Sequence, residues 1–281
     1  MKIKSIFPIS AMLLVVLMAS CKKDVVNNVS PISSSKDQLN NKTGVALTNA
    51  NGALKSAAVS AAFVDLKTAT RFGIIGGVGV SNNAGISLIY DLDVGIYPGD
   101  RSSVIGFPPA VITNGAIYAA GDIAPMGVTA MLIQAKQDLN DAYLFAQGAT
   151  FPQTTTVAGD QGGKTLAPGI YKSMSSLLIQ SGDLTLDAQG DPNAVWIFQI
   201  GSALTTVGGA GGNVILAGGA QAKNIFWQIG SSATIGDFTS FKGNVLALTS
   251  ITMNSGAVAQ GRMLAINGAV VLTSTNMINK P

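Results

Sequence analysis

The chain has 281 residues, of which 47% are hydrophobic and only 11% are charged, whereas a typical soluble domain has about 25% charged residues. It contains no histidine and no glutamate, which excludes histidine-based catalytic triads, histidine-ligated metals and a glutamate general acid or base. The formal net charge is +3, and without Lys2 and Lys4 it is about +1, which is too small for an electrostatic nucleic-acid binder.

The first 20 residues are typical of a secretory signal. Lys2 and Lys4 form a charged start, an apolar stretch runs from Ile6 to Met18, and small residues then precede Cys21. The segment Leu-Met-Ala-Ser-Cys that ends at Cys21 resembles a bacterial lipobox, in which the cysteine is lipidated and becomes the mature N-terminus. The alternative is an ordinary signal peptide with an incidental cysteine, which would give a secreted protein.

Cys21 is the only cysteine, so it cannot form an internal disulfide in an exported chain, and a lipid anchor explains its presence. We therefore expect an outer-membrane lipoprotein, exposed on the cell surface. The anchor would be the only membrane contact, because no stretch of 18 apolar residues follows it. Residues 21–60 are rich in Asn, Ser, Lys and Ala without periodicity, which predicts a flexible linker. Residues 61–281 are predicted to form the folded domain.

One helix is predicted in this domain, at about residues 124–148. Apolar residues from Val128 to Ala146 recur at spacings of three and four, which places them on one helical face. Polar residues such as Lys136 fall on the opposite face, and Gly148 is a natural stop. We expect this helix to pack along the side of the structure that the strands build.

The rest of the domain consists of short segments of alternating hydrophobicity, separated by Gly, Asn and Ser corners. This pattern fits a parallel β-helix better than a sandwich, which needs reversing hairpin turns. In a β-helix, each coil contributes one short strand to each of three faces. The expected strands include residues 184–186, 195–200, 204–206, 214–216, 225–229, 233–235, 245–248, 251–253, 263–266 and 270–273.

Two stretches of the predicted β-helix echo each other, since residues 198–205 resemble residues 227–234. Alternation places one threonine of each such coil on the outside, in a single column. The column is predicted to contain Thr205, Thr234, Thr252 and Thr273, with Ser232, Ser250 and Val271 in a neighbouring outward column. Neighbouring strands lie roughly 4.7–4.9 Å apart, so the columns would form a regular array of methyl and hydroxyl groups. The alternative interpretation is that threonine is simply favoured in strands.

The folded region also carries a series of motifs in a fixed order. They lie at residues 72–83, 91–99, 105–109, 115–118, 165–171, 195–201, 224–230, 241–244 and 261–265. Together they resemble the microbial ice-binding protein family over about residues 61–278. The resemblance implies a right-handed, discontinuous parallel β-helix of triangular cross-section, with the N-terminal coil stacked on the C-terminal one and one long α-helix alongside.

The resemblance also implies a function without catalysis. Members of the family adsorb to ice through one flat face rich in Thr, Ser and Ala, and so inhibit ice growth and recrystallisation or attach a cell to ice. Carried over to this sequence, the ice-binding residues would be Ser81, Thr205, Ser232, Thr234, Ser250, Thr252 and Thr273, with Gly79 and Asn83 beside them. An ice crystal is the implied partner of a monomer that uses no metal, cofactor or nucleic acid.

Some relatives carry a cap closed by a disulfide. This chain cannot form that bond, since its single cysteine is assigned to the anchor, so the structure of a cap at about residues 100–123 stays open.

Two other functions remain open. One is a surface adhesin of the same fold that binds a glycan or another partner. The other is a Ca²⁺-dependent polysaccharide lyase, based on Asp183, Asp187 and Asp191 near one predicted corner with Lys172 close in sequence. The stretch at 187–192 is, however, dense in turn formers.

Three further features have simpler structural explanations. Asp91 and Asp93 point to the same side of a strand and could bind Ca²⁺ or act as acid and base, but capping of a corner is the simpler role. Trp196 and Trp227 alternate with apolar neighbours and are expected in the core or against the helix. The glycine run at 208–212 lacks the Lys-Ser/Thr of a phosphate-binding loop and predicts a flexible corner.

Overall fold

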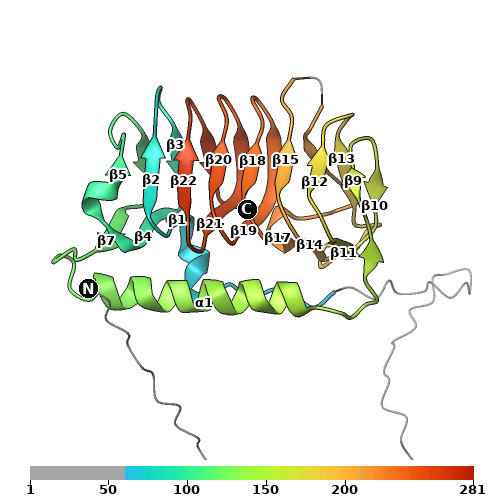
Figure 1. Ribbon diagram of the computed structural model, residues 1–281, viewed down its shortest axis with the longest axis horizontal. Helices are drawn as coiled ribbons and strands as arrows, with labels where there is room; N and C mark the ends of the chain where they lie inside the picture. Colours follow the sequence, from blue (N-terminus) through green and yellow to red (C-terminus); the bar gives the residue numbers. More distant parts are fainter. Residues whose placement is uncertain (1–60, 210) are drawn as a thin grey trace, which may run out of the picture. The chain divides into compact units, whose positions relative to one another are not determined.

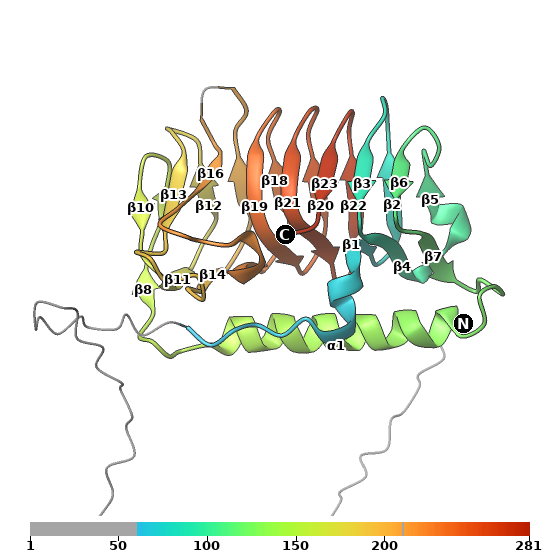
Figure 2. The same ribbon diagram turned by 180° about the vertical axis from the view of Figure 1, so that it is seen from behind.

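The structure is a computed structural model that describes residues 61–209 and 211–281. These residues form a three-sided parallel β-helix with one long helix, α1, along one side (Figures 1 and 2). The expected mainly β fold is therefore confirmed. The predicted signal at 1–20, the lipidation site Cys21 and the linker at 21–60 lie outside the described residues.

One side of the β-helix is an eight-stranded parallel sheet, which we call the flat face. Its outward side chains alternate with fully buried ones, as a sheet covered on one side requires. In order along the stack, its strands are β5 (Val104–Ile105), β2 (Gly79–Asn82), β22 (Ala269–Leu272), β20 (Ile251–Met253), β18 (Ala233–Ile235), β15 (Leu204–Thr206), β12 (Leu177–Ile179) and β9 (Gly159–Asp160).

The second side packs against α1, and we call it the helix face. The central strands on this side consist almost entirely of apolar residues, because both of their surfaces are buried. In order, they are β7 (Ile117–Ala120), β4 (Asp93–Asp100), β1 (Phe72–Gly76), the second halves of β21 (Val258–Ala265) and β19 (Ser240–Ala247), β17 (Ile225–Ile229), β14 (Trp196–Ile200), β11 (Gly169–Ser173) and β8 (Thr155–Thr156).

The third side, which we call the third face, is turned toward the viewer in Figure 2. β19 and β21 bend around the corner, so that their first halves belong to this face and their second halves to the helix face. The other strands of the third face are β6 (Val111–Thr113), β3 (Leu88–Tyr90), β23 (Met277–Asn279), and a separate three-stranded sheet of β16 (Val214–Ala217), β13 (Leu184–Asp187) and β10 (Thr165–Leu166).

The order of coils in space differs from their order in the sequence. On the flat face, β2 from the N-terminal coil pairs with β22 from the last coil, through Ser81 and Val271. The region at 100–123, left open by the sequence, forms a further coil outside β2, in which β5, β6 and β7 pair with β2, β3 and β4. The predicted stacking of the first coil on the last is therefore confirmed.

The interior of the β-helix is filled by apolar side chains from all three faces. Tyr171, Phe198, Trp227 and Phe241 stack from coil to coil, with ring centroids 5.4, 3.9 and 5.2 Å apart. Trp227 and Trp196 are fully buried, which confirms their predicted place in the core. Large aromatic side chains dominate the burial energy of a core, and their close packing from coil to coil resists relative movement of the coils.

Helix α1 (Val128–Gly148) packs its apolar stripe on the helix face, as predicted. It begins at Val128 rather than at about 124, because Gly127 has φ 88°, which is incompatible with an α-helix. Lys136, predicted to face solvent, is instead half-buried and donates to the main-chain oxygens of Ala265 and Ile266. Among the described residues, no helix is long and apolar enough to cross a membrane.

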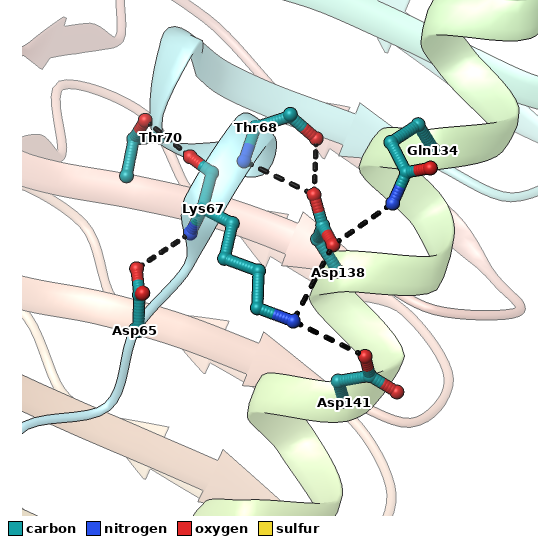
Figure 3. A network of polar contacts seen from close by, with 7 residues as sticks. All are labelled: Asp65, Lys67, Thr68, Thr70, Gln134, Asp138 and Asp141. Carbon is teal, nitrogen blue, oxygen red and sulfur yellow. Dashed lines mark hydrogen bonds and ion pairs between the residues drawn. The ribbon is translucent and has the colours of Figure 1, made fainter.

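A polar network joins α1 to the segment that leads into β1 (Figure 3). Asp138, only 3% exposed, accepts hydrogen bonds from the amide (3.1 Å) and hydroxyl (2.5 Å) of Thr68 and from the amide nitrogen of Gln134 (3.1 Å). The ammonium of Lys67 lies 3.7 Å from Asp138 and 3.5 Å from Asp141. Thr68 belongs to the 3₁₀ helix η1 (Lys67–Arg71); the described residues also form the 3₁₀ helices η2 (Arg101–Ser103) and η3 (Ala222–Asn224).

Candidate functional site

The central outward column of the flat face contains one residue from each of its eight strands. Thr252, Thr234 and Thr205 occupy successive positions in it, as the sequence echo predicted. From β5 to β9 the column is Ile105, Ser81, Val271, Thr252, Thr234, Thr205, Leu178 and Asp160. Ser81 thus lies in the same column, although it belongs to the first coil and the threonines belong to coils near the C-terminus.

The predicted place of Thr273 is wrong. Val271 pairs with Thr252, and Thr273 lies one outward position further along the chain. Residues paired between β19 and β21 are 18 positions apart in the sequence, as Ala247 and Ala265 are, whereas those paired between β20 and β22 are 19 apart, as Thr252 and Val271 are. The corner before β22 therefore contains one residue more than the corner before β20. A slip of two residues preserves the alternation of inward and outward side chains, so alternation could not detect the error.

A second outward column lies two residues before the first one along each strand. Ser232 and Ser250 lie in it, as predicted, whereas Val271 does not. Ala269 and Gly79 continue this column and are paired with each other.

The serine hydroxyls of this second column are partly used within the protein. Ser232 Oγ lies 2.6 Å from the hydroxyl of Thr249, and Ser250 Oγ accepts from the amide of Ala269 at 3.3 Å. These bonds join successive coils at the edge of the flat face, so the serines also fix the spacing of the coils.

The threonine hydroxyls of the central column, unlike these serine hydroxyls, are not hydrogen-bonded within the described part of the protein. Among the described residues, those of Thr205, Thr234 and Thr252 have no hydrogen-bond partner in the protein, and all three side chains are partly exposed. Behind them, the inward neighbours Leu204, Ala233 and Ile251 are 0–1% exposed. The strands that carry these hydroxyls are therefore held by a closely packed core, and the hydroxyls are free to form hydrogen bonds with a partner outside the protein.

The flat face is almost free of charge. Among the residues of its eight strands, the one ionisable side chain is Asp160, at the end of the stack in β9. Hydrogen bonds from the side chain of Ser181 and from the amides of Gly162, Gln180 and Ser181 lower the pKa of Asp160 to about 2, against the effect of its desolvation. This carboxylate is thus tied to the terminal coil, and the rest of the face offers neutral groups.

The aspartates that suggested a lyase serve local structure. Oδ1 of Asp183 accepts from Asn213, and the carboxylates of Asp187 and Asp191 accept amides two residues ahead, as turn caps do. Among the described residues, no group of three His, Cys, Asp or Glu side chains could hold a metal ion.

The pair Asp91 and Asp93 is also engaged in the protein. Asp91 accepts from the amide nitrogen of Asn114 at 2.8 Å, and Asp93 accepts from the amide of Ala116 and pairs with Arg71 at 2.6 Å. The two carboxylates thus join neighbouring coils at a corner, in agreement with the capping interpretation.

Two members of the central column, Ile105 and Leu178, carried no signal in the sequence that would place them there. Both belong to strands of two or three residues, too short for alternation to be recognised. Their outward position depends on pairing with Ser81 and Thr205, respectively.

Comparison with known proteins gives matches over most of the chain. A family model described as "Ice-binding-like" matches residues 74–278. An ice-binding protein of Nostoc sp. (strain HG1) is 43% identical over 215 residues, which cover 76% of this chain and 73% of that protein.

Solved structures agree with this match. An ice-binding protein from an Antarctic biological consortium has a TM-score of 0.70 and 42% identity, covering 79% of this chain and 92% of that one. A domain of ice-binding protein 1 from Shewanella frigidimarina has a TM-score of 0.74 and 33% identity, covering 79% of this chain and 98% of that one.

Proposed function

This chain belongs to the ice-binding-like family, and we propose that it adsorbs to ice through its flat face, slowing the growth and recrystallisation of ice. The observation that carries the proposal is the run of Thr205, Thr234 and Thr252, in register on three successive strands, with hydroxyls that no other described residue engages. The proposed activity requires no catalytic step.

The chemistry of the flat face suits frozen water. Ice carries no net charge, so charged groups would lose tightly held hydration for little gain, and this face has almost none. Threonine hydroxyls can bond into an ordered water layer, while the methyl groups of Thr and Val271 lie against that layer. Each contact is weak, so adsorption depends on many groups held in a rigid, preorganised plane. The stacked coils and buried aromatic column provide that rigidity.

The proposed site therefore centres on Thr205, Thr234 and Thr252 and extends through Val271 to Ser81. The neighbouring column of Ser232 and Ser250 forms one margin of the site. Thr273 borders the site on the other side and is not part of the central column.

We also propose that Cys21 is lipidated and ties the domain to the outer membrane as a monomer, which would let the cell attach to ice. The support is the lipobox-like segment that ends at Cys21. The first described residues lie on the helix face, where Phe63 packs edge-on against Phe226.

A single bulky substitution tests the proposed site. Thr234→Tyr places a large ring in the middle of the flat face, and it should abolish most of the thermal hysteresis and inhibition of recrystallisation. The matched control is Thr185→Tyr, the same exchange at an outward position of β13 on the third face. Equal activity of the two folded variants would refute the assignment of the flat face.

A further inference from the structure

The third face, whose strands are visible in Figure 2, carries two outward columns of side chains of opposite character. The first column is apolar over four strands, from β6 to β21, and consists of Val111, Leu88, Met277 and Val258. The second column, two residues further along each strand, is polar over the same strands and consists of Thr113, Tyr90, Asn279 and Gln260. Lys242 of β19 follows Gln260 in the polar column.

Within the described part of the chain, the polar column does not contribute side-chain hydrogen bonds that stabilise the fold. Among the described residues, the side chains of Tyr90, Asn279 and Gln260 make no hydrogen bond within the protein, although all three are only partly exposed. Elsewhere at the corners, amide side chains are bonded to the backbone, as that of Asn244 is to Lys223 and Ile225. The polar column therefore presents unsatisfied donors and acceptors on a rigid plane.

A polar pocket of about 250 Å³ adjoins this column. Three of its lining residues, Asp91, Asn114 and Lys280, directly follow Tyr90, Thr113 and Asn279 in the sequence. The other lining residues are Thr70, Arg71, Leu92 and Asp93. The column and the pocket thus form one continuous polar surface at the corner between the third face and the helix face.

The charges of the pocket balance. Arg71 forms an ion pair with Asp93 at 2.6 Å, Lys280 supplies the second positive charge, and Asp91, whose Oδ1 accepts from Asn114, supplies the second negative charge. The pocket therefore has no net charge, and Lys242 adds a single positive charge at the end of the polar column, which disfavours a polyanion or a polycation as the ligand. Its mixed donors and acceptors instead match a neutral ligand rich in hydroxyl groups.

We propose that this surface binds a neutral, extended, β-linked glycan chain. A pyranose ring has apolar C–H faces and polar hydroxyl edges, and the third face offers an apolar column beside a polar one. The ring of Tyr90 can pack on a sugar face, while Asn279, Gln260 and the carboxylate of Asp91 bond to hydroxyls. The four strands from β6 to β21 span roughly 14 Å, which is the length of about three linked sugars at roughly 5 Å each. A flat β-linked chain follows such a straight column, whereas a helical α-linked chain does not.

This site is separate from the proposed ice-binding face, because the two lie on different sheets. The third face is also chemically unlike the flat face, since it combines a tyrosine, two amides and a lysine where the flat face has threonines. The chain would then have two faces with two partners, frozen water and a neutral polysaccharide.

Titration of the purified chain with cellohexaose, followed by calorimetry, tests the proposal. Binding should be detectable at millimolar sugar and absent with maltohexaose, whose α-linkages curve the chain. Tyr90→Ala should weaken it by about ten-fold, and Gln260→Ala by several-fold. Gln137→Ala, an exposed glutamine on the outer surface of α1, is the matched control and should bind as the wild type does. If Tyr90→Ala fails to fold, Asn279→Ala takes its place.

Thermal hysteresis of the same variants separates this proposal from the ice-binding one. Tyr90→Ala should keep full activity on ice, and Thr234→Tyr should keep full affinity for cellohexaose. The proposal is overturned by an absence of cellohexaose binding, by binding that Tyr90→Ala and Asn279→Ala leave unchanged, or by a loss of ice activity in Tyr90→Ala with sugar affinity intact.

Discussion

Thr252 of β20 pairs with Val271 of β22, and this contact ends the threonine run of the flat face. On the other side of Val271 lies Ser81, which has a hydroxyl. The valine thus interrupts a series of hydroxyl groups that otherwise extends from β15 to β2.

Val271→Thr should lengthen the hydroxyl array and modestly raise thermal hysteresis, because the new side chain keeps one methyl and its branched shape. The position is only partly buried, so the free energy of unfolding should change by no more than about 0.5 kcal/mol. Val258→Thr, at an outward position of the third face, is the control and should not alter activity on ice. A fall in activity for Val271→Thr would show that this part of the face relies on apolar contact.

Asp138→Ala should destabilise the domain by about 1–3 kcal/mol, since it leaves the amide of Thr68 without its buried acceptor. Asp141→Ala should cost no more than about 1 kcal/mol, because its contact with Lys67 is exposed. Urea denaturation of both variants measures the difference. Equal losses would mean that the network in Figure 3 does not hold the entry segment on α1.

Acid should weaken the same network. Burial raises the pKa of Asp138, but hydrogen bonds from Thr68 and Gln134 and the charge of Lys67 outweigh it, so the pKa lies below its ordinary value of 3.8. The unfolded chain therefore binds the proton more tightly, and this stability is present at neutral pH and lost as the pH falls below about 4. The acid dependence of the unfolding free energy should be smaller in Asp138→Asn, and an unchanged dependence would contradict this assignment.

Lys136 should produce a dependence of the same sign at alkaline pH, with stability again rising as the pH rises. Its burial between α1 and the end of β21 lowers its pKa from 10.5 to about 8. Because the unfolded chain binds more protons between these two values, stability rises as the pH increases from 8 to 10.5, by on the order of 3 kcal/mol at most. The difference in unfolding free energy between wild type and Lys136→Met should shift in favour of the wild type over this range. A constant difference would refute the shift.

Much of the fold could be predicted from local pattern. Alternation predicts four of the flat-face strands, β15, β18, β20 and β22, and the outward side chains of Thr205, Thr234 and Thr252, because burial on one side forces a period of two. It does not predict β5, β2, β12 or β9. It also does not give the number of residues in a corner, so the predicted register of Thr273 is wrong by two positions.

Other features depend on contacts between distant parts of the chain. The burial of Asp138 and Lys136 follows from neighbours in η1 and β21, about 70 and 129 residues away in sequence, which helical periodicity does not reveal. Nothing in the local sequence of β2 indicates that it pairs with β22, and only the family resemblance predicts that the first coil stacks on the last.

The most direct test of the account is the partitioning of the purified chain into slowly grown ice. The wild type should be enriched in the ice fraction, and Thr185→Tyr should match it. Thr252→Tyr, folded according to its thermal unfolding, should be left in the liquid, because a large ring in the central column prevents the face from meeting a flat crystal. Equal enrichment of Thr252→Tyr and wild type would contradict the claim that the flat face binds ice.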